Sequence, residues 1–82
     1  MGTSAREKPL RLAEKLLEIR VRLHLSQNEM LERVDSNSKL SRVDISKYER
    51  GIREPSLITL LQYARTYGVP LEILADDNLD LP

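Results

Sequence analysis

Apolar residues recur along this chain at spacings of three and four, which is the spacing of one face of an α-helix. The first apolar stripe falls between Leu10 and His24, with arginine and glutamate on the opposite side, and it consists of Leu12, Leu16, Ile19 and Leu23. We therefore expect an amphipathic helix over residues 10–24.

A capping signal marks the start of a second helix. Ser26 and Glu29 have the spacing of a capping box, in which the serine hydroxyl and the glutamate carboxylate each accept a backbone N–H of the other residue. The helix should begin at Gln27 and end near Asp35, where a run of polar residues favours a loop. Its inward-facing residues would be Met30, Leu31 and Val34.

A third helix is predicted over residues 42–50. Ser41 is suited to cap it, and Asp44 lies in the first turn, near the positive end of the helix dipole. Gly51 should end it, because glycine readily adopts the left-handed conformation found after helices. Ile45 and Tyr48 would form its buried face.

Two further helices complete the pattern. After a linker over residues 52–55, Ser56 can cap a helix over residues 57–67 that ends at Gly68. Pro70 then precedes a short helix over residues 71–75. The expected core positions of the longer helix are Leu57, Leu60, Leu61 and Ala64.

Five short helices with brief connections predict a compact all-α five-helix bundle as a single domain over residues 10–76. Residues 1–9 lack the apolar pattern and are expected to form a flexible tail. Residues 77–82 are expected to form an acidic, loosely held C-terminal tail.

Composition narrows the classes of function. The chain of 82 residues has no cysteine and one histidine, so a thiolate metal site is excluded and no metal or cofactor is expected. A histidine pair, a nucleophilic cysteine and a glycine-rich phosphate loop are also missing, which argues against an enzyme. No apolar run approaches the roughly 20 residues of a membrane span, and we expect a soluble cytoplasmic protein without a membrane partner.

The formal net charge is zero, with thirteen basic and thirteen acidic residues, which argues against nucleic acid as a partner. The distribution weakens that objection. All thirteen basic residues lie in residues 1–65 with nine acidic ones, whereas residues 66–82 carry four acidic residues and no basic one. Five basic residues fall between Lys39 and Arg53, so the chain has a basic middle and an acidic end.

Four sequence segments in this order and spacing resemble the Cro/repressor-type, or xenobiotic-response-element (XRE), helix-turn-helix family. They are Leu25-Ser26-Gln27, Ile45-Ser46-Lys47-Tyr48-Glu49-Arg50-Gly51, Arg53-Glu54-Pro55-Ser56-Leu57 and Tyr67-Gly68-Val69-Pro70-Leu71-Glu72-Ile73-Leu74. The resemblance implies a fold like the lambda repressor DNA-binding domain, with the helix-turn-helix formed by the second and third helices. It also implies double-stranded DNA as partner and a place on the nucleoid when bound.

The resemblance assigns base contacts to the third helix, at Arg42, Val43, Asp44, Ser46 and Lys47. It assigns phosphate contacts around that helix to Gln27, Arg50 and Arg53, and we add Lys39 and Ser41 as further candidates beside them. Arg20 and Glu49 occupy the positions of a structural salt bridge in the family. Arg20 lies on the inward side of its helix, where an unpaired charge would be costly.

Two residues have competing interpretations. Asp44 either accepts a hydrogen bond from a cytosine amino group or caps its own helix. Lys39 lies in a turn, residues 35–40, that is longer than the family's, and this extension either adds a phosphate contact or is simply tolerated. His24 also departs from the family, since it replaces the usual glycine after the first helix.

Apolar residues near the last two helices suggest a self-complementary patch for a homodimer, made of Ile58, Tyr63, Tyr67 and Ile73. The leading hypothesis is therefore a dimeric, sequence-specific DNA-binding protein that regulates transcription as a repressor. The alternative is a protein-interaction module of the same fold, an antitoxin or adaptor that binds a partner protein.

Overall fold

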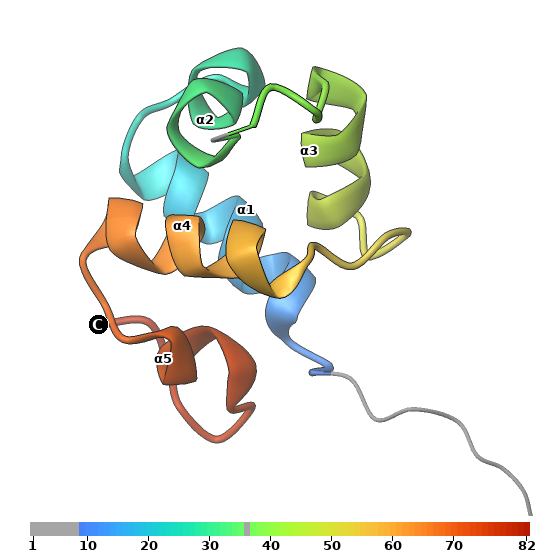
Figure 1. The fold of residues 1–82 in the computed structure, drawn as a ribbon. Coiled ribbons are helices and arrows are strands. Elements are labelled where there is room, and N and C mark those ends of the chain that lie inside the picture. Colours follow the sequence, from blue (N-terminus) through green and yellow to red (C-terminus); the bar gives the residue numbers. More distant parts are fainter. Residues whose placement is uncertain (1–8, 36) are drawn as a thin grey trace, which may run out of the picture.

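The computed structural model describes residues 9–35 and 37–82, and every regular element among them is an α-helix. The helices are α1 (Leu12–Arg22), α2 (Gln27–Val34), α3 (Arg42–Glu49), α4 (Leu57–Tyr67) and α5 (Leu71–Ala75). In Figure 1, α2 and α3 lie at one end of the molecule and α5 at the other, with α1 and α4 between them. The predicted all-α five-helix architecture is confirmed.

The helix ends follow the predicted caps closely. The Ser26 hydroxyl accepts the Glu29 amide and the Glu29 carboxylate accepts the Ser26 amide, so the capping box forms at the start of α2. The Ser56 hydroxyl likewise accepts the Thr59 amide at the start of α4. The main differences are that α1 spans Leu12–Arg22 rather than residues 10–24, and that α3 ends at Glu49.

Three helices end in a left-handed residue. Gly51 follows α3 with φ +72° and Gly68 follows α4 with φ +85°. His24, which stands where the family has glycine, adopts φ +58° after α1. Its amide donates to the Val21 carbonyl and the Leu25 amide donates to the Arg20 carbonyl, which is the Schellman arrangement. A non-glycine residue is therefore held in a strained conformation at the α1–α2 connection.

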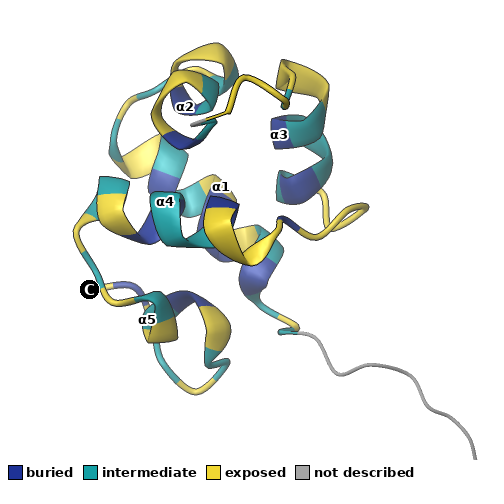
Figure 2. Ribbon diagram, viewed as in Figure 1, coloured by how far each residue is buried: buried dark blue, intermediate teal, exposed yellow. Residues whose placement is uncertain are grey.

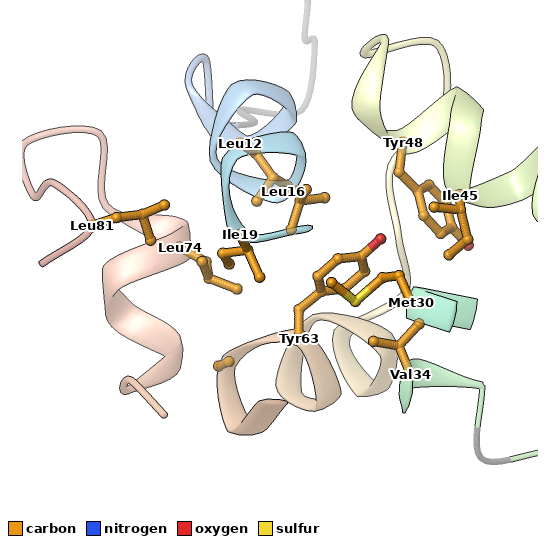
Figure 3. Close-up of a cluster of buried hydrophobic side chains, with 11 residues drawn as sticks. Leu12, Leu16, Ile19, Met30, Val34, Ile45, Tyr48, Tyr63, Leu74 and Leu81 are labelled. Carbon is orange, nitrogen blue, oxygen red and sulfur yellow. The ribbon is translucent and has the colours of Figure 1, made fainter. Parts of the chain in front are cut away.

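The core is built from residues of all five helices and of the C-terminal segment. Figure 3 shows Tyr63 of α4 at its centre, between Leu74 and Leu81 on one side and Ile45 and Tyr48 on the other. Its ring is fully buried, and its hydroxyl has no hydrogen-bond partner among the described residues. Burial raises the pKa of this hydroxyl well above its ordinary value.

Two expectations about the core were wrong. Leu57 was expected to face inward, but it is 67% exposed at the start of α4, where Thr59, Tyr63 and Ala64 take the inward positions. Tyr63 was expected on a surface patch, but it is 0% exposed. The inward face of α4 is thus rotated from the predicted one, and the large Tyr63 side chain lies on it. Figure 2 shows buried and exposed residues on different sides of α4.

The expected loose C-terminal tail is also wrong, because residues 76–82 pack against α1. The Asp77 carboxylate accepts the amides of Leu10 and Arg11, at 2.9 and 3.0 Å, and so caps the start of α1 from outside the helix. The Arg11 guanidinium forms an ion pair with Asp80 at 2.7 Å, and Leu81 joins the core. Residues 1–8 and Ser36, which include most of the predicted N-terminal tail, lie outside the described residues.

A buried lysine connects α1 to the same segment. Lys15 is 1% exposed, and its ammonium donates to the carbonyls of Ile73 and Asp76 at 2.8 Å each. Carbonyls at the end of a helix have no partner within the helix, so this cation closes the end of α5. No helix in the described ranges is long and apolar enough to cross a membrane.

Candidate nucleic-acid interface

One side of α3 is directed away from the bundle. Ile45 and Tyr48 bury its inner side, whereas the residues on the other side are partly or fully exposed. Helical spacing brings together on that outer side Arg42, Val43, Ser46, Lys47 and Arg50. Val43 is 48% exposed, although an apolar residue gains free energy from burial. The structure thus gathers four of the five predicted base-contacting residues, and the predicted phosphate contact Arg50, on one surface.

Among the residues that the structure describes, the cations on this surface have no carboxylate partner. In the described part of the chain, Arg42, Lys47 and Arg50 take part in no ion pair. Arg50 donates from its Nε to the carbonyl of Ser46 in its own helix, at 3.3 Å. Three positive charges are therefore presented to solvent by one short helix and its cap.

Arg42 is connected to α2 by a side-chain hydrogen bond. Its Nη1 donates to Oε1 of Gln27 at 3.4 Å, and Nε2 of Gln27 donates to Oε1 of Glu49 at 3.1 Å. Gln27 is the first residue of α2, so this amide links the start of α2 to both ends of α3. The predicted phosphate contact Gln27 thus lies directly beside the predicted base contact Arg42.

The Glu49 carboxylate also forms the expected structural salt bridge with the Arg20 guanidinium. Nε and Nη2 of Arg20 donate to the two carboxylate oxygens of Glu49, at 2.6 and 3.1 Å. Arg20 also donates to the Leu25 carbonyl at 3.0 Å. Charge-assisted hydrogen bonding to Glu49 raises the pKa of Arg20, despite the opposing effect of partial burial. This pair fixes α3 against α1.

Asp44 lies on the flank of α3 rather than on its outer side. Its Oδ2 accepts the Ser41 amide at 2.9 Å, and its Oδ1 accepts Nη1 of Arg53 at 2.6 Å. Both oxygens of the carboxylate therefore have partners within the protein. Ser41, a predicted phosphate contact, is the exposed residue before α3.

Asp35 closes the extended turn between α2 and α3, although the sequence predicted it only as the end of the second helix. The Asp35 carboxylate accepts the amides of Lys39 and Leu40, at 3.0 and 3.2 Å. This arrangement leaves Lys39 exposed, next to the start of α3. An aspartate before a polar run is a general turn signal, and its exact acceptor role depends on the path of the loop.

The four residues predicted for a dimer patch do not form one surface. Ile58 is exposed, but Tyr63 is fully buried and Ile73 is packed against the core. Tyr67 accepts a hydrogen bond from Arg22 at 2.7 Å, and the Arg22 guanidinium lies 6.0 Å from the centre of its ring.

Known proteins share this arrangement of helices. A helix-turn-helix family model matches residues 16–74, which run from α1 to α5. The chain belongs to the helix-turn-helix family. The resemblance to its Cro/repressor-type (XRE) branch is confirmed. Comparison with curated proteins gives no match.

Solved structures of two proteins are similar to this chain. The restriction-modification controller protein C.AhdI from Aeromonas hydrophila has a TM-score of 0.64 and 25% sequence identity, and the match covers 77% of this chain and 89% of that one. The BldD DNA-binding domain of S. venezulae has a TM-score of 0.62 and 33% identity, covering 85% of this chain and 99% of that one. A second structure of the BldD DNA-binding domain has the same TM-score, with 32% identity.

Proposed function

We propose that this protein binds double-stranded DNA in a sequence-specific manner, with α3 in the major groove. The observation that carries the proposal is the outer side of α3, where Arg42, Lys47 and Arg50 are presented without carboxylate partners in the described residues. The family match and the similarity to the BldD DNA-binding domain support it. A helix of this diameter fits the major groove, and unpaired cations beside it can neutralise phosphates.

The base contacts are proposed for the first two turns of α3. Arg42 can donate two hydrogen bonds to O6 and N7 of guanine, and Val43 can contact a thymine methyl group. Ser46 and Lys47 follow on the same side of the helix. The Gln27 amide restrains Arg42, which limits the side-chain freedom that is lost on binding.

The phosphate contacts are proposed around the edges of α3. Gln27 and Ser41 lie at the starts of α2 and α3, where backbone N–H groups and the helix dipole favour an anion. Lys39, Arg50 and Arg53 add positive charge from the two turns that flank α3. Such contacts fix the position of the protein on DNA without reading the sequence.

We propose further that the bound protein regulates transcription as a repressor, and that two copies bind two half-sites as a homodimer. The similarity to C.AhdI, a controller protein, supports a regulatory role. The exposed Ile52 in the linker before α4, and the exposed Leu57 and Ile58 in the first turn of α4, supply apolar area for self-association in place of the buried Tyr63. The oligomeric mass in light scattering tests the dimer, and a reporter gene placed behind the selected site tests the direction of regulation.

Selection of bound duplexes from a random pool tests the proposed function. We expect an enriched motif, and we expect Arg42→Ala to weaken binding by about 1–3 kcal/mol and to relax preference at one base pair. Arg65→Ala, on the exposed side of α4, is the matched control and should change neither quantity. A folded protein that enriches no motif and binds duplex DNA without salt dependence would overturn the proposal and favour the protein-interaction alternative.

A further inference from the structure

Arg53 differs from Arg42, Lys47 and Arg50 because a carboxylate of α3 holds its side chain. Nη1 of Arg53 lies 2.6 Å from Oδ1 of Asp44. The Asp44 side chain is 15% exposed and that of Arg53 is 56% exposed. The Asp44 side chain is therefore largely enclosed, whereas more than half of the Arg53 side chain is open to solvent.

The main chain brings Arg53 back beside α3. Gly51, with φ +72°, takes the chain out of the helical path after α3. The amides of Ile52 and Arg53 both donate to the Lys47 carbonyl, at 3.0 and 3.4 Å. From there the Arg53 side chain reaches toward the first turn of α3, where Asp44 holds its guanidinium.

Asp44 is itself fixed, so it can fix its partner. Its other oxygen, Oδ2, accepts the Ser41 amide at 2.9 Å. Arginine has five N–H donors in a planar group, and one engaged nitrogen leaves other donors for a phosphate. An arginine that is already oriented loses less side-chain freedom when it binds.

We infer that Asp44 is a positioning residue that orients Arg53 toward the DNA backbone, rather than a residue that reads a base. The inference rests on the proposed function and gives the Asp44 carboxylate a role in DNA binding. Through Asp44, the first turn of α3 and the loop after α3 meet DNA as one unit. The Asp44–Arg53 pair persists in the complex, with a phosphate oxygen on the exposed donors of the guanidinium.

A double-mutant cycle on a selected duplex tests the inference, with Asp44→Asn and Arg53→Gln as the two changes. The asparagine oxygen can still accept the Ser41 amide, which preserves the helix start, and a thermal melt verifies folding. If Asp44 acted only by repelling the DNA phosphates, Asp44→Asn would strengthen binding by the same factor with and without Arg53. We expect instead that Asp44→Asn weakens binding about fivefold more in the unmodified chain than in the Arg53→Gln variant.

Arg50→Gln provides the matched control, since Arg50 also follows α3 but, among the described residues, its side chain bonds to its own helix. The coupling of Asp44→Asn with Arg50→Gln should be absent. A coupling of opposite sign would show that Asp44 competes with phosphate for Arg53, and zero coupling would show independent action; either result overturns the inference. A changed base preference in Asp44→Asn would also overturn it, because it would show base contact.

Arg53→Gln leaves the Asp44 cap intact and gives a second measurement. We expect the slope of log K against log salt to fall in magnitude by about 0.9, the value for one phosphate. An unchanged slope would overturn the inference while the proposed function stands. Failure of the unmodified protein to bind DNA would instead refute the proposed function itself.

Discussion

The cations of α1 and the cations of α3 meet different partners. In α1 and its N-cap, Arg11, Lys15, Arg20 and Arg22 each bond to a carboxylate or to backbone carbonyls from distant parts of the chain. On α3 and its C-cap, Arg42, Lys47 and Arg50 have no ion pair in the described ranges. The same residue types thus stabilise the fold in one helix and remain available to a partner in the other.

This difference explains why a net charge of zero is compatible with the proposed DNA binding. Asp80 of the C-terminal segment forms an ion pair with Arg11 at the start of α1, and the Asp77 carboxylate accepts the backbone amides of Leu10 and Arg11. These two acidic charges therefore lie at the start of α1 and not on the outer side of α3. At physiological ionic strength, charges more than about 8 Å apart are largely screened, so the local charge matters more than the sum.

The largest effect on stability is expected at the Arg20–Glu49 pair. Glu49→Ala leaves the partly buried Arg20 guanidinium without its carboxylate and should lower the free energy of unfolding by about 3 kcal/mol. Urea unfolding measures the change. Glu32→Ala removes an exposed glutamate of α2 and should have almost no effect. Equal losses in both variants would show that Glu49 does not hold α1 against α3.

Replacement of one lysine by methionine, in α1 or in α3, distinguishes the cations that stabilise the fold from those available to a partner. Lys15→Met should lower the free energy of unfolding by about 2 kcal/mol, since it removes charge-assisted hydrogen bonds to two carbonyls. Lys47→Met should leave stability within about 0.5 kcal/mol, as is usual for a surface change, and should weaken DNA binding. Chemical unfolding and a binding titration of both variants distinguish the roles. Lys15→Met with unchanged stability would remove the contrast between the helices.

A smaller effect of opposite sign is expected at the end of α1. His24→Gly relieves the cost of a left-handed side-chain-bearing residue and should raise the free energy of unfolding by about 0.5–1 kcal/mol. His24→Ala keeps the strained backbone and is the control. The midpoint of thermal unfolding measures the stability of both variants. A lower midpoint for His24→Gly than for the unmodified protein would contradict the Schellman geometry.

The smallest effect is expected on the stability of the protein at acidic pH. Hydrogen bonds from the amides of Leu10 and Arg11 hold the pKa of Asp77 below its ordinary value. A depressed carboxylate pKa in the folded state adds stability above the unfolded pKa, near 3.9, and this stability is lost as the pH falls further. Asp77→Asn should therefore reduce the slope of stability against pH below about pH 4. An identical acid profile for the variant would show that Asp77 does not cap α1.

Local signals predicted the helices well because the ends of these helices are set by nearby residues. Ser26, Ser56, Gly51 and Gly68 act within four residues of their own positions, so the sequence alone contains the reason for each end. The outer side of α3 was predictable for the same reason, since helical spacing places Arg42 and Lys47 on one side of the helix.

Residues that act across the fold were harder to predict. Lys15 lies beside the apolar stripe of α1, and that position was the available signal, but its carbonyl partners come from 58 and 61 residues away. Tyr63 was placed on a surface patch because it belongs to a group of apolar residues near the last two helices. Its burial depends on how α4 packs against α1 and α2. Asp77 caps a helix 66 residues earlier, which no local pattern indicates.

The salt dependence of DNA binding by two arginine variants tests the central claim most directly. Arg50→Gln and Arg11→Gln remove the same charge from the chain, one beside α3 and one at the start of α1. We predict that Arg50→Gln lowers the magnitude of the log K against log salt slope by about 0.9, the value for one lost phosphate contact, and that Arg11→Gln leaves it unchanged. Equal reductions in both variants, or a reduction only in Arg11→Gln, would contradict the separation of folding and binding cations.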